Sequence, residues 1–264
     1  MTKQVILNAD DFGWTDGHNL AVEKASMLGV LHRASLMCTG EAFYEAVELA
    51  QRLPKLGVGV HLTLNEGFPL TKHTSLPNVT CVNGAFYDDA FDLARLWLQG
   101  KLITDEVSLE WRCQLERALE AGIRPTHLDS HKHVHLIPPL LEVVIALAQE
   151  AHIDYIRLPL ERSFRHILRR GVSGVILWML AIRASKRLLQ AGMKFADHFI
   201  GIGYSGEMTS SRLRRSMLHA GGGLTEIMVH PAVVTPAVRA LKRRYRWAAR
   251  YRFEEELEAL CSLR

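Results

Sequence analysis

The segment from Thr126 to Pro138 concentrates side chains that can bind a metal ion or transfer a proton. It reads THLDSHKHVHLIP and holds four of the chain's 13 histidines together with one aspartate: His127, Asp129, His131, His133 and His135. Imidazole and carboxylate groups together suit Zn²⁺, and also manganese, iron, cobalt or nickel, whereas Mg²⁺ prefers oxygen ligands. On its own the segment is compatible with a metal cluster, a catalytic loop or a histidine-rich strand end.

Other acids and bases follow short apolar runs elsewhere in the chain. VILNADD ends in Asp10 and Asp11, GVHL contains His61, IRLP contains Arg157, and MVHP contains His230. If these runs are parallel strands of a barrel, their carboxyl ends meet at one mouth, which is where barrel enzymes carry their active sites. We therefore expect these side chains to share one site with the histidine-rich segment.

The adjacent carboxylates of Asp10 and Asp11 constrain the local backbone. Consecutive strand residues point to opposite faces, so both can serve one site only if the chain bends, which Gly13 permits. Two close carboxylates repel unless a cation or proton separates them, which suggests one metal ligand and one catalytic base. The simpler alternative is a turn that caps the next helix, where Asp16 would serve equally well. His61 and the histidine-rich segment favour the metal, and three protein ligands would leave a position open for water.

Short apolar runs alternate with longer helical ones along the chain, which predicts a parallel sheet with helical crossovers. The expected strands are 4–9, 34–38, 57–64, 126–130, 155–158, 198–202 and 225–229, and the clearest helices are 17–28, 43–52, 106–121, 139–151 and 211–220. About seven such units in residues 1–264 predict a single-domain α/β protein with an irregular (β/α) barrel. A doubly wound open sheet is the alternative. We expect residues 67–99, rich in Gly, Pro and Asn, to form a long loop over the mouth.

The composition is that of an ordinary globular protein, with 48% hydrophobic residues and a net charge of +4. This mild excess of positive charge does not by itself indicate a nucleic-acid partner. The four cysteines form no C-x-x-C pair, so neither a zinc ribbon nor a redox motif is expected, and they suit a reducing compartment. The N-terminal apolar run is too short for a signal peptide, and no run of 18 apolar residues is present. We expect a cytoplasmic protein; nothing in the sequence indicates its oligomeric state.

Four motifs in this order resemble those of the YdjC-like carbohydrate deacetylases, which include the chitooligosaccharide deacetylases. They are NADDFG, GVHLTL, THLDSHKHVH and MVHPA, and the resemblance spans Val5 to Ala232. The sequence looks most similar to the subfamily associated with hopanoid biosynthesis. The stretches GVLHRASLM, YSGEMTSSRL and GGLTEIMVHPA carry that closer resemblance.

The resemblance implies a β/α-barrel-like fold and a hydrolase that removes N-acetyl groups from amino sugars with one divalent metal ion. The implied metal ligands are Asp11, His61 and His131, Asp10 matches the catalytic base, and His230 matches the candidate general acid. Family members are commonly described with Mg²⁺, whereas the ligand chemistry favours Zn²⁺, so the identity of the metal stays open. The substrate that this implies contains N-acetylglucosamine, and the subfamily points to an N-acetylglucosaminyl hopanoid. Another metal hydrolase such as a phosphoesterase, and a non-catalytic sugar- or lipid-binding protein, are the alternatives.

The remaining polar residues have supporting roles in this scheme. Arg157 either orients Asp10 or forms a buried structural salt bridge. Asp129 can accept the second ring N–H of a metal-binding histidine, with His127 on the same face of the strand. Of His133 and His135, we expect one to contact the substrate and the other to be structural.

Two basic segments are candidates for contact with a membrane. Residues 162–190 have an apolar centre, Val172 to Ile182, flanked by Arg and Lys, which fits either a buried crossover helix or an interfacial helix. The C-terminal segment 239–264 begins with residues 239–252, in which Arg and Lys are interleaved with Tyr and Trp, as in a solvated helix, a nucleic-acid patch or a membrane-surface patch. With a lipid-linked substrate in view, we rank an anionic membrane above nucleic acid and predict peripheral association with the inner membrane.

Overall fold

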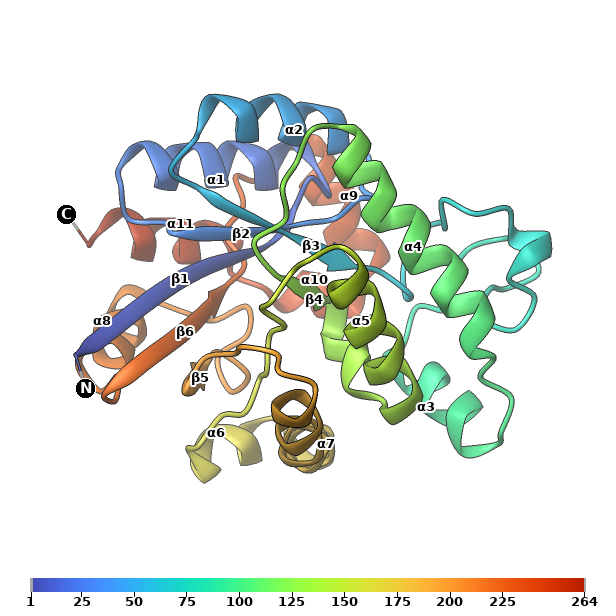
Figure 1. The fold of residues 1–264 in the computed structure, drawn as a ribbon. Helices are drawn as coiled ribbons and strands as arrows, with labels where there is room; N and C mark the ends of the chain where they lie inside the picture. Colours follow the sequence, from blue (N-terminus) through green and yellow to red (C-terminus); the bar gives the residue numbers. More distant parts are fainter. Residues whose placement is uncertain (1, 264) are drawn as a thin grey trace.

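Six parallel strands form one curled sheet in the computed structural model, which describes residues 2–263 (Figure 1). They are β1 (Lys3–Phe12), β2 (Arg33–Leu36), β3 (Gly57–Leu62), β4 (Leu128–Ser130), β5 (His198–Ile200) and β6 (Gly223–Val229). Their order is β4-β3-β2-β1-β6-β5, so the first strand pairs with the last. A doubly wound sheet reverses its order instead and does not pair its first strand with its last. The predicted α/β class and irregular barrel are therefore confirmed, as a half-barrel surrounded by helices.

The fifth predicted strand, at residues 155–158, is not a regular strand. Ile156 forms a single parallel bridge with Leu128 of β4, and Glu161 forms one with Phe199 of β5. The stretch from residue 156 to residue 161 thus links the two edges of the curled sheet without a continuous ladder. Pro159 lies between the two bridges, and because proline has no N–H to donate, a regular ladder cannot pass through it.

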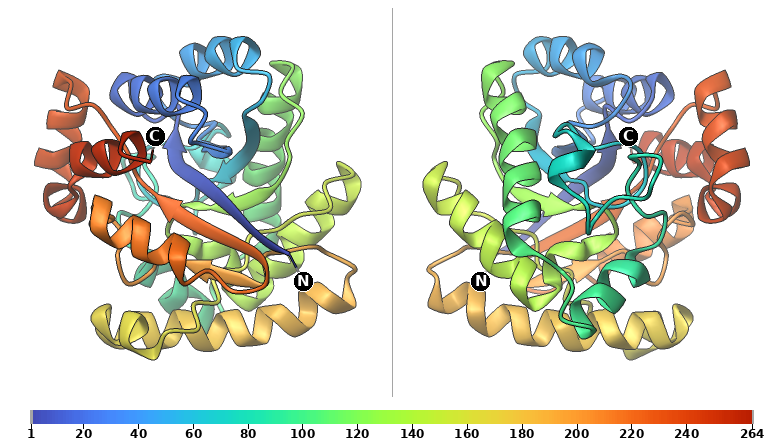
Figure 2. Two further views of the ribbon diagram at one scale, coloured as in Figure 1. Left: turned by 90° about the vertical axis from the view of Figure 1, so that its left-hand side faces the viewer. Right: turned by 90° about the vertical axis from the view of Figure 1, so that its right-hand side faces the viewer.

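Helices cover the outer face of the sheet, as Figures 1 and 2 show. The predicted helices appear within a few residues of their expected bounds: α1 (Asp16–Met27), α2 (Phe43–Arg52), α4 (Thr104–Glu120), α5 (Pro138–Glu150) and α8 (Ser210–Leu218). Residues 162–190 form α6 (Phe164–Arg169) and α7 (Gly171–Gln190), and the C-terminal segment forms α9 (Pro236–Arg244), α10 (Arg246–Arg250) and α11 (Phe253–Cys261). No helix within residues 2–263 is long and apolar enough to cross a membrane.

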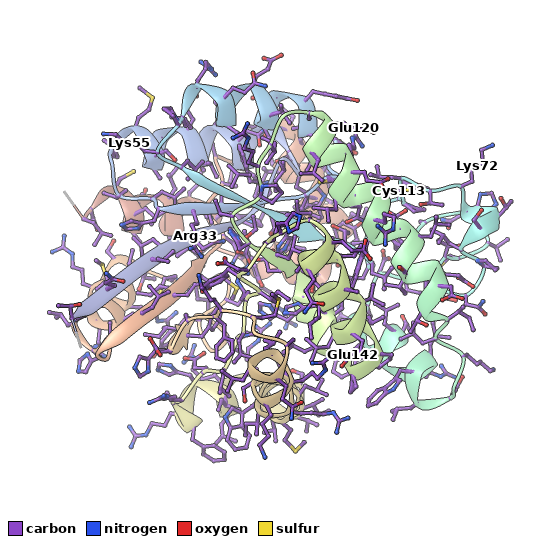
Figure 3. The ribbon with its side chains drawn as sticks, in the orientation of Figure 1. Arg33, Lys55, Lys72, Cys113, Glu120 and Glu142 are labelled. Carbon is purple, nitrogen blue, oxygen red and sulfur yellow. The ribbon has the colours of Figure 1, made fainter. Side chains whose placement is uncertain are left out.

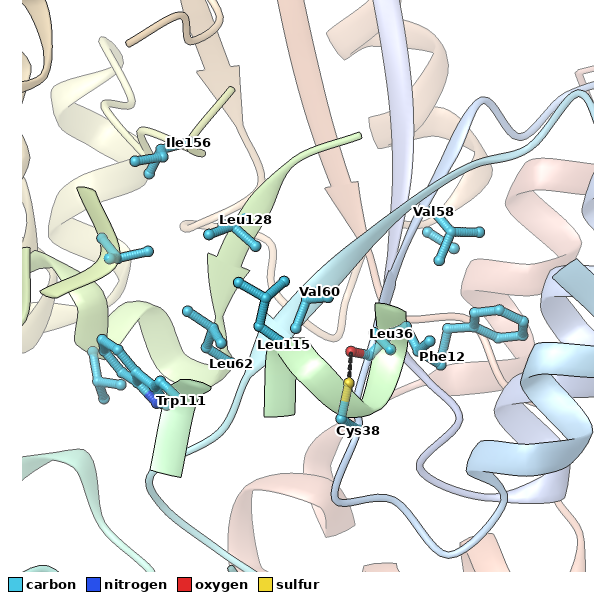
Figure 4. Packing of buried hydrophobic residues seen from close by; sticks show 14 of the residues in the cluster. Phe12, Leu36, Cys38, Val58, Val60, Leu62, Trp111, Leu115, Leu128 and Ile156 are labelled. Carbon is cyan, nitrogen blue, oxygen red and sulfur yellow. Dashed lines mark hydrogen bonds between the residues drawn. The ribbon is translucent and has the colours of Figure 1, made fainter. Parts of the chain in front are cut away.

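The core lies between the sheet and its helices. Trp111 and Leu115 of α4 pack with Val60 and Leu62 of β3 and with Leu128 of β4 (Figure 4). Strands buried on both faces are typical of parallel sheets, and this accounts for their nearly continuous apolar sequences. Charged side chains lie on the outside, among them those of Lys55, Lys72, Glu120 and Glu142 (Figure 3).

Of the loop predicted at residues 67–99, the part up to residue 89 is largely irregular, as expected. The loop contains a short 3-10 helix, η1 (His73–Ser75), and it ends at α3 (Ala90–Leu98), a helix that the prediction had counted as part of the loop. The side chain of Asp89 accepts a hydrogen bond from the Phe91 N–H and so caps the first turn of α3. A further 3-10 stretch, η2 (His131–Leu136), follows β4 directly and contains three of the histidines of the histidine-rich segment.

Candidate active site

Asp11, His61 and His131 come together from three different strand ends. Each offers a ligand atom, and these atoms lie within 4.8 Å of one another. Asp11 Oδ1 lies 3.5 Å from His61 Nε2 and 3.1 Å from His131 Nδ1. Burial would raise the pKa of Asp11, but the nearby imidazoles, His131 first, hold it well below its usual range. The carboxylate is therefore ionised and available as a ligand.

The chemistry of this group fits a divalent metal ion. Among residues 2–263, Asp11 Oδ2 is buried and has no hydrogen-bond partner, which is costly for a charged oxygen unless a cation occupies the space beside it. One carboxylate and two imidazoles form the donor set of many catalytic metal sites. A second group of potential ligands, Asp10, His61 and Asp129, overlaps the first at His61.

Each of the two histidines has a carboxylate behind it. Asp129 Oδ1 lies 2.7 Å from His61 Nδ1, which is the outer-shell arrangement expected for that aspartate. Burial would raise the pKa of Asp129, but Arg157 and His61 hold it well below its usual range. Glu66 Oε2 lies 2.9 Å from His131 Nε2. Burial would lower the pKa of His131, but Asp11 and Glu66 raise it to about 9 in the metal-free protein.

Glu66 could not be selected as a site residue from the sequence. It follows β3 by four residues in a loop, and only the fold brings it to His131. The single available signal was an acidic residue shortly after the strand that carries His61. Burial would raise the pKa of Glu66, but His131 and Lys132 lower it below the ordinary value, so the side chain is a carboxylate.

Arg157 holds Asp10 in a fixed orientation. Its Nη1 and Nη2 each lie 2.7 Å from an oxygen of Asp10, its Nη1 lies 2.6 Å from Asp129, and its Nε donates to Glu226 at 2.6 Å. The guanidinium is fully buried. Of the two roles considered for Arg157, orientation of Asp10 thus has direct contacts, although the same side chain also joins a buried ion network.

His230 faces Asp10 from the end of β6. Its Nε2 lies 3.9 Å from Asp10 Oδ2, and its backbone N–H donates to Glu256 of α11. Burial lowers the pKa of His230 more than Asp10 and Asp11 raise it, so the imidazole is neutral at neutral pH. Burial also raises the pKa of Glu256, to about 7.

The other three histidines of the segment from Thr126 to Pro138 occupy distinct positions. His127 bonds Thr126 and Ser35 inside the barrel, and its ring lies where a side chain at Gly59 would have to be. His135 bonds Ser130 Oγ at 2.6 Å and the Arg157 carbonyl at 3.0 Å, so neither ring nitrogen is free. His133 lines the cavity described below.

Unfavourable backbone conformations occur close to Asp11, His61 and His131. Five non-glycine residues of the described chain have positive φ, and four of them line the site: Asp11 (66°), Glu66 (65°), Lys132 (52°) and His133 (56°). Such conformations cost about 1–3 kcal/mol each and persist where the surrounding structure demands them, commonly at functional sites. The bend expected near Asp10 and Asp11 is thus made by Asp11 itself, where the β1–β2 register also shifts.

These residues form the floor of a cavity of about 780 Å³. Asp10, Asp11, His61, His131 and His230 all line it. Its walls come from the 67–99 region, α7 and the C-terminal segment, including Phe91, Ile176, Leu177, Leu180, Tyr245, Trp247 and Tyr251. Both basic segments singled out in the sequence therefore border the same opening.

Comparison with known proteins places this fold and site in a family. The profile of the YdjC-like proteins matches residues 4–264. The chain belongs to the YdjC-like family. A carbohydrate deacetylase of Brevibacillus brevis is 33% identical over 238 residues, covering 89% of this chain and 84% of the relative. A chitooligosaccharide deacetylase of Salmonella typhimurium is 30% identical over 243 residues, covering 90% and 85%. The predicted family is confirmed, and the hopanoid subfamily stays a prediction.

Solved structures agree with the fold. A protein of Enterococcus faecalis V583, proposed to cleave cellobiose phosphate, superposes with a TM-score of 0.73 at 25% identity, covering 99% of this chain and 95% of the other. An uncharacterised protein of Agrobacterium tumefaciens C58 matches with a TM-score of 0.52 at 14% identity, covering 99% and 82%, and this shows likeness of fold alone.

Proposed function

We propose that this YdjC-like protein is a metal-dependent hydrolase that removes the acetyl group from an N-acetylglucosamine unit. The observation that carries the proposal is the convergence of Asp11, His61 and His131 beside the Arg157-bound Asp10 on one cavity floor. The relatives named carbohydrate and chitooligosaccharide deacetylases support the substrate class.

Asp11, His61 and His131 would hold one divalent ion, Zn²⁺ or Mg²⁺. The two imidazoles favour Zn²⁺ or a similar transition metal, because Mg²⁺ prefers oxygen ligands. When bound, the ion supplies Lewis-acid chemistry, which polarises the amide carbonyl and stabilises negative charge on its oxygen.

The chain's own residues supply the proton transfers. Asp10 removes a proton from the attacking water while Arg157 fixes its carboxylate. The new C–O bond forms at the acetyl carbon, the C–N bond breaks, and the amine needs a proton to leave. His230, whose neutral Nε2 faces Asp10 Oδ2 at 3.9 Å, relays the proton that Asp10 has taken to the amine once the two groups come within hydrogen-bond distance in the substrate complex. The products are acetate and a free amino sugar.

We further propose that the sugar is linked to a lipid, with an N-acetylglucosaminyl hopanoid as the candidate. One wall of the cavity is apolar and consists of Ile137, Ile176, Leu177 and Leu180. A soluble oligosaccharide has no hydrocarbon group to place against this wall. The hydrocarbon part of a lipid-linked sugar would bury apolar surface there, which contributes about 25 cal/mol per Å².

Peripheral association with the cytoplasmic face of the inner membrane is part of the same proposal. Phe164, Leu168, Val172 and Met179 of α6 and α7 are exposed, and each is more than half uncovered. Four arginines line the adjoining cavity and make no salt bridge within residues 2–263: Arg170, Arg244, Arg246 and Arg250. Exposed apolar side chains beside unpaired cations suit an anionic lipid surface.

Acetate release tests the reaction. The protein should release acetate from N-acetylated chitooligosaccharides or from an N-acetylglucosaminyl hopanoid in detergent, and Asp10→Asn should abolish release at a temperature where the variant is still folded. If neither substrate yields acetate, the proposed activity is wrong. Activity on the lipid-linked sugar should exceed that on the soluble one if the apolar wall binds the aglycone.

Sedimentation with vesicles containing anionic phospholipid tests the membrane contact. The double variant Arg246→Glu/Arg250→Glu should bind much less than wild type. Lys55→Glu/Arg124→Glu makes the same charge change at the opposite end of the barrel, where β3 and β4 begin, and should bind normally. Equal loss in both variants would indicate general charge attraction, and absence of wild-type binding would refute the contact.

A further inference from the structure

Glu66 receives three donors on one buried carboxylate. Oε2 lies 2.9 Å from His131 Nε2, and Oε1 lies 2.5 Å from Lys132 Nζ and 2.6 Å from Trp247 Nε1. The residue is only 2% exposed and has a left-handed φ of 65°. A buried carboxylate with three hydrogen-bond donors, on a residue with an unfavourable backbone conformation, indicates that the surrounding site holds Glu66 in this position.

The contact with His131 determines which ring nitrogen can face a metal ion. A neutral imidazole carries its proton on one nitrogen and a lone pair on the other. Glu66 accepts from Nε2 and so holds a proton there, which leaves Nδ1, 3.1 Å from Asp11, as the nitrogen that would bind a metal ion once the ion displaces its proton. Asp129 does the same for His61, with the two nitrogens exchanged. Each histidine of the group is thus oriented by its own carboxylate.

The contact with Trp247 brings the C-terminal segment into the site. Trp247 lies in α10, more than 100 residues after His131, and its ring stacks on Trp14 at 5.6 Å and approaches His131 at 5.8 Å. Trp14 also packs edge-on against His131 at 5.1 Å. The indole of Trp247 therefore contacts the ring of the metal ligand and bonds the carboxylate behind it.

We propose that Glu66 is a positioning residue for the metal ligand His131, and that Trp247 links the C-terminal segment 239–264 to metal affinity through that carboxylate. The inference rests on the proposed metal site and deepens it. Loss of an outer-shell partner typically lowers metal affinity about 10- to 100-fold. The basic C-terminal segment accordingly has a function inside the active site in addition to any on the surface.

The dissociation constant for Zn²⁺ alone, measured by competition with a chromophoric chelator, tests this without reference to activity. Glu66→Gln keeps the shape and removes the charge, so its dissociation constant should rise about 10- to 100-fold. Trp247→Phe removes one donor and keeps the ring, so it should raise the constant by a smaller factor. Glu110→Gln is the matched control. Glu110 is a buried glutamate that accepts from Leu70, Thr71 and Gln114 and makes no hydrogen bond to a candidate metal ligand, so affinity should stay within about twofold of wild type.

The outcomes separate the inference from the proposed function. Wild type that binds no Zn²⁺ would overturn the metal site and the inference with it. Wild type that binds Zn²⁺ while Glu66→Gln binds equally well would overturn the inference alone. Melting temperatures of the metal-free variants show whether a weaker variant is merely unfolded, and equal loss in Glu66→Gln and Glu110→Gln would also count against a specific role.

Discussion

Replacing Arg157 with lysine separates orientation of Asp10 from simple charge neutralisation. The guanidinium contacts Asp10 through two nitrogens, Asp129 through one and Glu226 through its Nε, all between 2.6 and 2.7 Å. Lysine keeps the positive charge but offers a single nitrogen on a flexible stem, so it cannot reproduce the two parallel bonds to Asp10.

The contacts set the expected size of the effect. A hydrogen bond to a charged group contributes about 1.5–3 kcal/mol. If lysine loses one of the two bonds to Asp10, and the base must be fixed for proton transfer, kcat should fall about 10- to 100-fold, because 1.36 kcal/mol corresponds to a tenfold change in rate. KM should change little, because Arg157 is fully buried beneath Asp10 and does not line the cavity.

The assay is steady-state acetate release at a temperature where every variant is folded, as judged by circular dichroism. Glu226→Gln is the matched control, because it alters the same buried network at the Nε and Tyr155 end, away from Asp10. We expect Glu226→Gln to lose stability but less than about threefold in kcat. Equal losses of kcat in the two variants would show that Arg157 acts only through stability, and the orienting role would be refuted.

Two further predictions concern histidines. His131→Ala should lose its metal on dialysis, whereas His135→Ala should retain about one ion per chain. Because both ring nitrogens of His135 bond protein atoms, His135→Ala should lose only about 1–3 kcal/mol of stability. Elemental analysis that finds the metal in both variants, or in neither, would contradict this prediction. Burial lowers the pKa of His127 from 6.5 to about 3. Between those values the unfolded chain binds a proton that the folded protein does not, so stability falls as the pH drops below 6.5, by about 2 kcal/mol at pH 5. Urea unfolding at pH 7.5 and pH 5 should show that His127→Gln removes this part of the difference, and an unchanged difference would show that His127 is not its source.

Much of the fold followed from periodicity, because strands buried on both faces and amphipathic crossover helices leave clear patterns. The segment 155–158 was misjudged because its apolar run resembles a strand, while Pro159 and single bridges prevent a ladder. The helix α3 was missed because Gly, Pro and Asn dominate the region before it, although Asp89 provides a capping signal. Whether α7 is covered could not be decided from the sequence either, since both Ala181, which is buried, and Val172, which is exposed, lie in one apolar stretch.

Some residues of the site could likewise be predicted from the sequence, and others could not. Asp10, Asp11, His61 and His230 could be grouped from the sequence because strand ends in a barrel share a mouth. The contact between Glu66 and Trp247 could not be predicted, because it joins a loop to the helix α10 across 181 residues, and only the whole fold brings the two together. The histidine-rich segment looked like a self-contained cluster, yet in the structure it contributes a single member, His131, to the group with Asp11 and His61.

Acetate release before and after metal removal tests the central claim most directly. Protein treated with EDTA should lose activity on its N-acetylglucosamine substrate, and addition of Zn²⁺, Mg²⁺ or another divalent ion should restore it in wild type but not in His61→Ala. Retention of full activity after complete metal removal, or restoration in His61→Ala to the wild-type level, would contradict the proposed metal-dependent deacetylase.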